Sequence, residues 1–226
     1  SHHMFTVGLG PTANSAFSIA TMLIAVPTGV KIFNWIGTLW GGSIDFKTPL
    51  LFSLGFISMF IIGGLSGVMH ASVPSDFQQQ DTYFVVAHFH YVLFGGSLLG
   101  IFSGIYYWWP KMTGRLLHEG LGKIHFWLTF IGFNVTFFPM HFSGLAGMPR
   151  RVADYPDAFA GWNFVSSMGA YLSFFGALFF LYVVYRTFTS GEKVEANYWG
   201  EGARTLEWSV PSPAPFHTHE EPPMVR

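Results

Sequence analysis

The sequence predicts an all-α protein, a polytopic bundle of about five membrane-spanning helices. Half of the 226 residues are hydrophobic and only 10% are charged, whereas soluble domains carry about 25% charged residues. The few charges are clustered, which leaves long stretches without Asp, Glu, Lys or Arg. Each of these stretches exceeds the roughly 20 apolar residues that a membrane-spanning helix needs. A soluble fold is therefore excluded.

Five spans are expected in chain order, at about 13–39, 49–72, 83–110, 123–146 and 159–186. Glycine clusters at 63–67 and 95–100 would let neighbouring helices approach closely. The chain therefore divides into a transmembrane region, 1–190, and a polar, proline-rich tail, 191–226. The tail is expected either to be extended and packed on a neighbour or to be disordered. Because the chain opens at Ser1 without a methionine, it reads as a piece of a longer protein.

Basic residues predict the orientation, because cytoplasmic loops carry an excess of Lys and Arg. One side of the spans carries Lys47, Lys111, Arg115, Lys123, Arg186, Lys193, Arg204 and Arg226. The other side carries only Arg150 and Arg151, and Lys31 lies inside the first span. The tail is therefore expected to be cytoplasmic.

The third span contains two histidines, His88 and His90, within a stretch free of charge. Ionisable residues inside a membrane are costly and mark function. Residues i and i+2 are rotated by about 200° on a helix, so the two imidazoles cannot share one metal but could serve two cofactors on opposite faces. Two core histidines bonded to backbone carbonyls are the simpler interpretation. Since the chain has no cysteine, disulfides, iron–sulfur clusters and thiol catalysis are excluded within it.

A second histidine pair, His2 and His3, opens the chain. Adjacent residues cannot share a helix face, but an irregular turn can aim both at one ion. Imidazole suits copper, iron and zinc. Taken alone, a histidine pair at a terminus is weak evidence for a metal site, and a cloning remnant is an alternative.

Several longer motifs, in chain order, resemble those of haem–copper oxidase subunit I. The segments 2–8 and 24–31 are similar to its copper-ligand loop and the span that follows. The segment 81–92 is similar to its haem-ligand span, and 137–156 to the loop before its last span. The tail segment 205–213 looks like that of bacterial members. The resemblance covers nearly the whole chain. It implies that these are the C-terminal spans of a subunit with about twelve membrane spans.

The resemblance implies two haems, taken as haem A, and a copper ion, copper B. His2 and His3 are then two of the three copper ligands, and His88 binds the high-spin haem. His90 is an axial ligand of the low-spin haem on the opposite face, and Phe89 lies between the haems. Histidine ligation is typical of an oxygen-reactive haem. The remaining ligands would belong to upstream spans, so this piece alone is expected to be inactive.

The implied activity is that of a cytochrome c oxidase in a bacterial plasma membrane. Electrons from cytochrome c would reduce O2 to water with proton pumping, in a complex with subunits II and III and without any nucleic acid. A quinol oxidase shares these motifs and remains an alternative. A nitric oxide reductase would lack the motif around Lys31, and an ion or solute transporter would explain Lys31 but not the histidine and arginine pairs.

The pair Arg150-Arg151 is the only basic pair on the outer side. A nearby dianionic group would explain it, and haem propionates qualify because arginine pairs with carboxylates bidentately. A solvent-exposed loop pair is the alternative. Asp81 is a candidate magnesium ligand, although Gln80 stands where the family usually has histidine, which puts that site in doubt.

Lys31 is the one formal charge within a span, and Thr28 and Thr21 lie on the same side of the helix. The resemblance implies a proton path through these residues from the cytoplasm to the metal centre. A lysine that snorkels to the interface is the alternative. Six other histidines are expected to have no ligand role, since most of them lie at span ends or in the tail, where imidazole is half solvated: His70, His118, His125, His141, His217 and His219.

Overall fold

The structure is a computed structural model that describes residues 2–223. The α-helices, in chain order, are α1 (Pro11–Leu39), α2 (Thr48–Ala71), α3 (Val73–Gln79), α4 (Tyr83–Val92), α5 (Leu99–Thr113), α6 (Glu119–Leu145) and α7 (Ala160–Ser190). A π-helical turn, Leu93–Leu98, joins α4 to α5, and 3-10 turns occur at Asp157–Phe159 and Leu206–Ser209. The described residues contain no strand, which confirms the all-α prediction.

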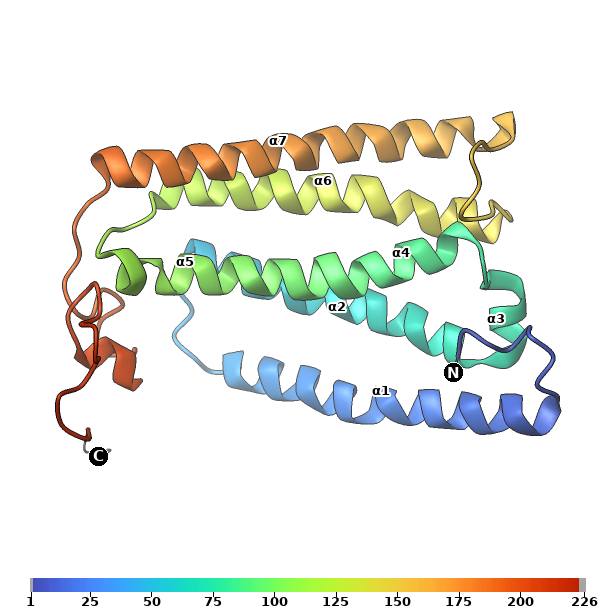
Figure 1. Ribbon diagram of the computed structural model, residues 1–226, viewed down its shortest axis with the longest axis horizontal. Helices are drawn as coiled ribbons and strands as arrows, with labels where there is room; N and C mark the ends of the chain where they lie inside the picture. The colour runs from blue at the N-terminus through green and yellow to red at the C-terminus, as the bar shows by residue number, and fades with distance from the viewer. Residues whose placement is uncertain (1, 224–226) are drawn as a thin grey trace.

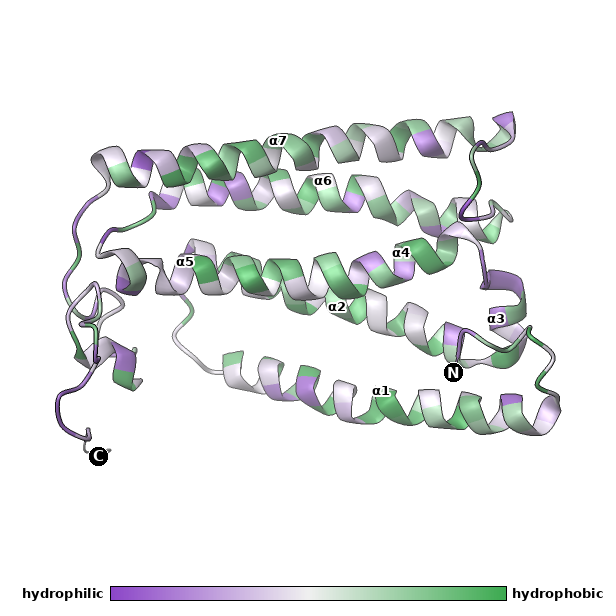
Figure 2. Cartoon of the chain, in the orientation of Figure 1, coloured by the Kyte–Doolittle hydropathy of each residue, from purple (hydrophilic) through white to green (hydrophobic). Residues whose placement is uncertain are grey.

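The long helices lie side by side with their axes roughly aligned (Figure 1). α6 packs between α7 and α4, α2 packs on α4 and α5, and α1 lies at the edge of the bundle against α2. The middle of the bundle is largely hydrophobic, while the tail is mostly hydrophilic (Figure 2). This arrangement places α4 between α2 and α6.

Four helical segments are long and apolar enough to cross a membrane: α1, α2, the continuous segment Tyr83–Thr113, and Asp157–Ser190. The fifth predicted span coincides with α6, which is 27 residues long but is not among these four. Polar residues such as His125 and Asn134 lower its hydropathy. They are tolerated because α6 is covered on both sides by other helices.

Local signals explain where several helices begin and end. Proline occupies the first turn of α1 at Pro11 and of α2 at Pro49, where its missing N–H would be unpaired in any case. α5 ends at Gly114, which has a φ of 69°, a left-handed conformation that glycine adopts without strain. The predicted spans agree with these boundaries to within a few residues, but the short helix α3 and the π-helical turn were not predicted.

Glycine allows α2 to approach α4 and the π-helical turn. A Cβ atom on Gly63 would lie 3.0 Å from the backbone of Tyr91 and Val92, and one on Gly95 would lie 2.7 Å from Cβ of Met59. The prediction of close approach is therefore confirmed at these positions. It is wrong for Gly64 and Gly100, neither of which has a neighbour within 4 Å.

A further close contact joins α6 to α4, and it gives a testable prediction. A Cβ atom on Gly144 would collide with the backbone nitrogen of Phe84, in the first turn of α4. Overpacking of this kind typically costs about 1–3 kcal/mol. Gly144→Ala should therefore lower the thermal unfolding temperature of the purified full-length protein. Gly161→Ala, which meets nothing within 4 Å, is the control that should leave it unchanged; equal unfolding temperatures would contradict the packing.

The described part of the tail packs on α5 of the same chain. Lys111 is 6% exposed, and its Nζ donates to the carbonyls of Val210 at 2.6 Å and Ala196 at 2.9 Å. Trp199 stacks on Tyr107 with ring centroids 5.2 Å apart. The described part of the tail is therefore held against its own chain, and the expected packing on a neighbour stays a prediction.

Candidate functional site

The loop before α4 fixes the start of this helix. The hydroxyl of Thr82 donates to the carbonyl of Gln79 at 2.7 Å and accepts from the backbone N–H of Phe84 at 3.2 Å. A side-chain acceptor at this position satisfies an otherwise unpaired helix donor. The backbone N–H of Tyr83 donates to the carbonyl of Met148 at 3.0 Å, which ties α4 to the loop after α6. The histidines of α4 follow on a helix whose first turn is anchored twice.

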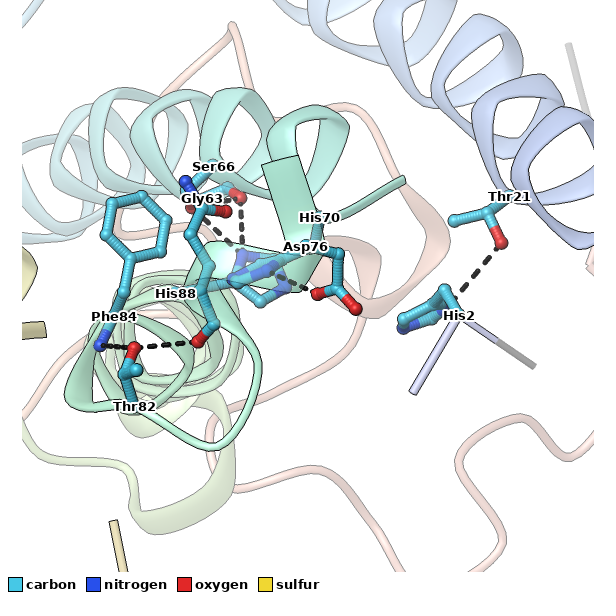
Figure 3. A network of polar contacts seen from close by, with 10 residues as sticks. His2, Thr21, Gly63, Ser66, His70, Asp76, Thr82, Phe84 and His88 are labelled. Carbon is cyan, nitrogen blue, oxygen red and sulfur yellow. Dashed lines mark hydrogen bonds and ion pairs between the residues drawn. The ribbon is translucent and has the colours of Figure 1, made fainter. Parts of the chain in front are cut away.

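His88 is held against α2 (Figure 3). Its Nδ1 lies 2.9 Å from the carbonyl oxygen of Gly63 and 2.9 Å from Oγ of Ser66. A carbonyl can only accept, so Nδ1 carries the proton and Nε2 is left as a lone-pair donor. A Cβ on Gly67 would approach Cε1 of His88 to 3.0 Å, so glycine makes room for the ring. This is the tautomer and the support that a metal-binding histidine needs.

His90 faces the other way, toward α6. Its Nδ1 lies 2.8 Å from the carbonyl oxygen of Val86, so here too Nε2 is the unprotonated nitrogen. The ring stacks on Phe137 of α6 with centroids 4.0 Å apart. The prediction that the two histidines of α4 point to opposite faces is thus confirmed, and they cannot share one metal.

A cavity of about 510 Å³ lies between α1 and α2, within the usual range for small-molecule sites of about 300–1,000 Å³. His2, His70 and His88 line it together with Thr21 and Thr28 of α1. Its remaining lining is mostly aliphatic and aromatic. An apolar cavity with an imidazole lone pair beside it fits a flat metal-bearing macrocycle.

His2 and His3 lie in the turn before α1, with ring centroids 4.2 Å apart. Nδ1 of His2 is 3.5 Å from the hydroxyl oxygen of Thr21. Burial lowers the pKa of both histidines, so the neutral form that binds metals is favoured. Among the described residues no group of three His, Cys, Asp or Glu side chains could hold a metal; a copper ion here would have two protein donors from this chain.

The arginine pair divides into two different environments. The guanidinium carbon of Arg150 lies 5.5 Å from the centre of the Phe89 ring, and its Nε is buried without a hydrogen-bond partner among the described residues. Arg151 is exposed and has a φ of 62°. The backbone N–H of Arg150 donates to the carbonyl of Asp81 at 2.9 Å. The side chain of Asp81 is exposed.

The three residues of the predicted proton path are only partly brought together. Thr21 and Thr28 line the cavity shared with His2 and His88. Lys31 does not; it is exposed, and its Nζ lies 5.4 Å from the centre of the Trp35 ring.

A model of the family described as cytochrome c and quinol oxidase polypeptide I matches residues 1–172. The chain belongs to this family. It is 57% identical to cytochrome c oxidase subunit 1 of Cereibacter sphaeroides, over 99% of this chain and 40% of that protein. It is 54% identical to the subunit 1 of Bacillus sp. (strain PS3), over 100% of this chain and 37% of that protein. The chain thus spans about 40% of the length of these curated relatives.

The fold also matches a solved structure of a heme–copper terminal oxidase dimer, with a TM-score of 0.74 at 22% identity. The match covers 85% of this chain and 39% of that one. The helix arrangement of this oxidase polypeptide is therefore that of a haem–copper oxidase, as the sequence resemblance implied.

Two expectations for histidines of this oxidase polypeptide are wrong. His70 is 4% exposed and His125 is fully buried, whereas both were expected to be half solvated. His70 is buried because α3 folds over the end of α2, and His125 because aromatic rings of α2, α5 and α7 enclose it. Ser66 and Gly63, which hold His88, were also missed; their position in a glycine-rich turn of α2 was the only signal.

Proposed function

We propose that this chain is the C-terminal part of the catalytic subunit of a cytochrome c oxidase. His90 would bind a low-spin haem A, His88 a high-spin haem A, and His2 with His3 copper B. Bound there, these groups supply the redox chemistry by which electrons from cytochrome c reduce O2 to water with proton pumping. The observation that carries the proposal is the pair of imidazoles on opposite faces of α4, each with Nδ1 bonded to a carbonyl and Nε2 free.

Contacts within this chain orient the two proposed ligands. Gly63 and Ser66 hold the ring of His88 so that its lone pair is directed away from α2. The carbonyl of Val86 does the same for His90 from within its own helix. Such partners raise the basicity of a ligating imidazole and fix its orientation. Phe89 separates the two ligands along the chain.

The outer side of the site supports a role in binding carboxylates. The buried Nε of Arg150 has no partner among the described residues, and a haem propionate would supply one. The exposed carboxylate of Asp81, next to Gln80, is proposed as a magnesium ligand. Exposed apolar side chains on α1 and α7, such as Phe33 and Phe164, support contact with lipid or with other subunits. We propose a bacterial plasma membrane and assembly with subunits II and III, and the excess of basic residues on one side supports a cytoplasmic tail.

Arg150→Leu should lower the haem midpoint potentials, because a positive charge that favours the added electron is lost. Opposite charges about 4 Å apart attract by roughly 4 kcal/mol at an effective dielectric constant of 20, before screening. Arg151→Leu should have a much smaller effect, since this side chain is exposed. Redox titration of the full-length protein measures both, and unchanged potentials in Arg150→Leu would place the pair away from the haems.

The electron donor decides between the two oxidase types that the family includes. Oxygen consumption of the full-length complex should be fast with reduced cytochrome c and slow with ubiquinol. The reverse preference would replace the proposed activity with that of a quinol oxidase.

A further inference from the structure

His70 and Asp76 form a buried pair beside the proposed haem ligand. Nδ1 of His70 lies 3.2 Å from Oδ1 of Asp76, and each side chain is 5% exposed. The pair joins the last turn of α2 to α3, two helices that meet at Ser72. A carboxylate buried this deeply is costly unless it is hydrogen-bonded. The contact therefore fixes the orientation of the His70 ring.

The fixed ring of His70 lies directly against His88. The two ring centroids are 5.0 Å apart in an edge-to-face arrangement, and the ring of Phe84 packs on His70 at 5.3 Å. Figure 3 shows His70 between Asp76 and His88, with Asp76 on the side nearer to His2. Edge-to-face ring pairs are worth about 0.5–1.5 kcal/mol beyond the area they bury.

The support of His88 from α2 alone is one-sided. Gly63 and Ser66 hold only its Nδ1, which leaves rotation of the ring about that hydrogen bond open. A neighbouring ring whose own orientation is fixed would prevent this rotation. Gly67 provides the space in which the ring of His88 fits against the backbone of α2.

We propose that the His70–Asp76 pair is a positioning element that sets the ring orientation of His88 and hence the geometry of the iron–histidine bond. The proposal rests on the proposed function, in which His88 binds the high-spin haem. His70 acts here through its packing on the ligand, and Asp76 acts through His70. Neither residue needs to touch the metal.

The test uses the full-length oxidase and the iron–histidine stretching line in the resonance Raman spectrum of the reduced protein. His70→Leu and Asp76→Ala should each shift and broaden this line by more than its wild-type width. His70→Phe keeps a ring beside His88, and Asp76→Asn keeps a hydrogen-bond acceptor for His70. Asp76→Asn should return the line close to its wild-type position, whereas His70→Phe, whose ring is no longer held by Asp76, should restore it only in part.

The low-spin haem at His90 serves as the internal control for folding. An unshifted line in His70→Leu and Asp76→Ala, with the low-spin haem band intact, would overturn the positioning role. A wild-type protein without an iron–histidine line, or a line that survives His88→Ala, would instead overturn the proposed function and this inference with it.

Discussion

Alanine at His90 should remove the low-spin haem signal from the full-length oxidase and leave the carbon monoxide band of the oxygen-reactive haem in place. Alanine at His88 should do the reverse. The effects separate because His88 is supported by α2 and His90 packs on α6. Reduced-minus-oxidised and carbon monoxide difference spectra of the two variants report each signal independently.

A matched control is His141→Phe. His141 lies on α6 between Phe84 and Tyr91, with ring centroids 5.2 and 5.3 Å away. A phenyl ring preserves this packing, so both haem signals should persist. If alanine at His88 and at His90 abolished the same single signal, the assignment of two cofactors to two faces of α4 would be wrong.

Lys31→Met should reduce steady-state oxygen consumption by roughly 100-fold or more, the contribution that a positioned proton-transfer group commonly makes. The resting spectrum should stay normal, because Lys31 does not touch the cavity lined by His2 and His88. Thr28 lies one helical turn away and does line that cavity, as does Thr21. The proposed path therefore enters at Lys31 and continues along these two hydroxyls, with slow reduction of the high-spin haem as its kinetic signature.

Lys47→Met is the control for a general loss of positive charge at the same end of the bundle. Lys47 lies in the loop before α2 and pairs with Asp45 at 3.2 Å. This variant should respire at the wild-type rate. If the Lys31→Met oxidase also respired at the wild-type rate, Lys31 would be only a surface charge beside Trp35.

The fold was largely predictable because a membrane imposes a length and a polarity on each helix. Charge-free stretches located α1, α2 and α7 to within a few residues. They could not reveal α3 or the π-helical turn, since both depend on how the ends of α2 and α4 pack. Hydropathy was also a weak guide to α6, whose polar residues are shielded by neighbouring helices.

The site was predictable where local geometry decides it. The spacing of His88 and His90 alone placed them on opposite faces, as the structure confirms. The pairing of His70 with Asp76 was not predictable. His70 lies in α2 and Asp76 in α3, so no helical periodicity relates the two positions. The different environments of Arg150 and Arg151 likewise follow from a backbone bend at Arg151 that the sequence does not signal.

The central claim is that α4 carries the ligands of two separate haems, and counting haems tests it most directly. The pyridine haemochrome of the purified full-length subunit gives the number of haems per chain. Carbon monoxide binding gives the fraction that reacts with a gaseous ligand. We predict two haems per chain, one of which binds carbon monoxide; a colourless protein, or one haem per chain, would contradict the account.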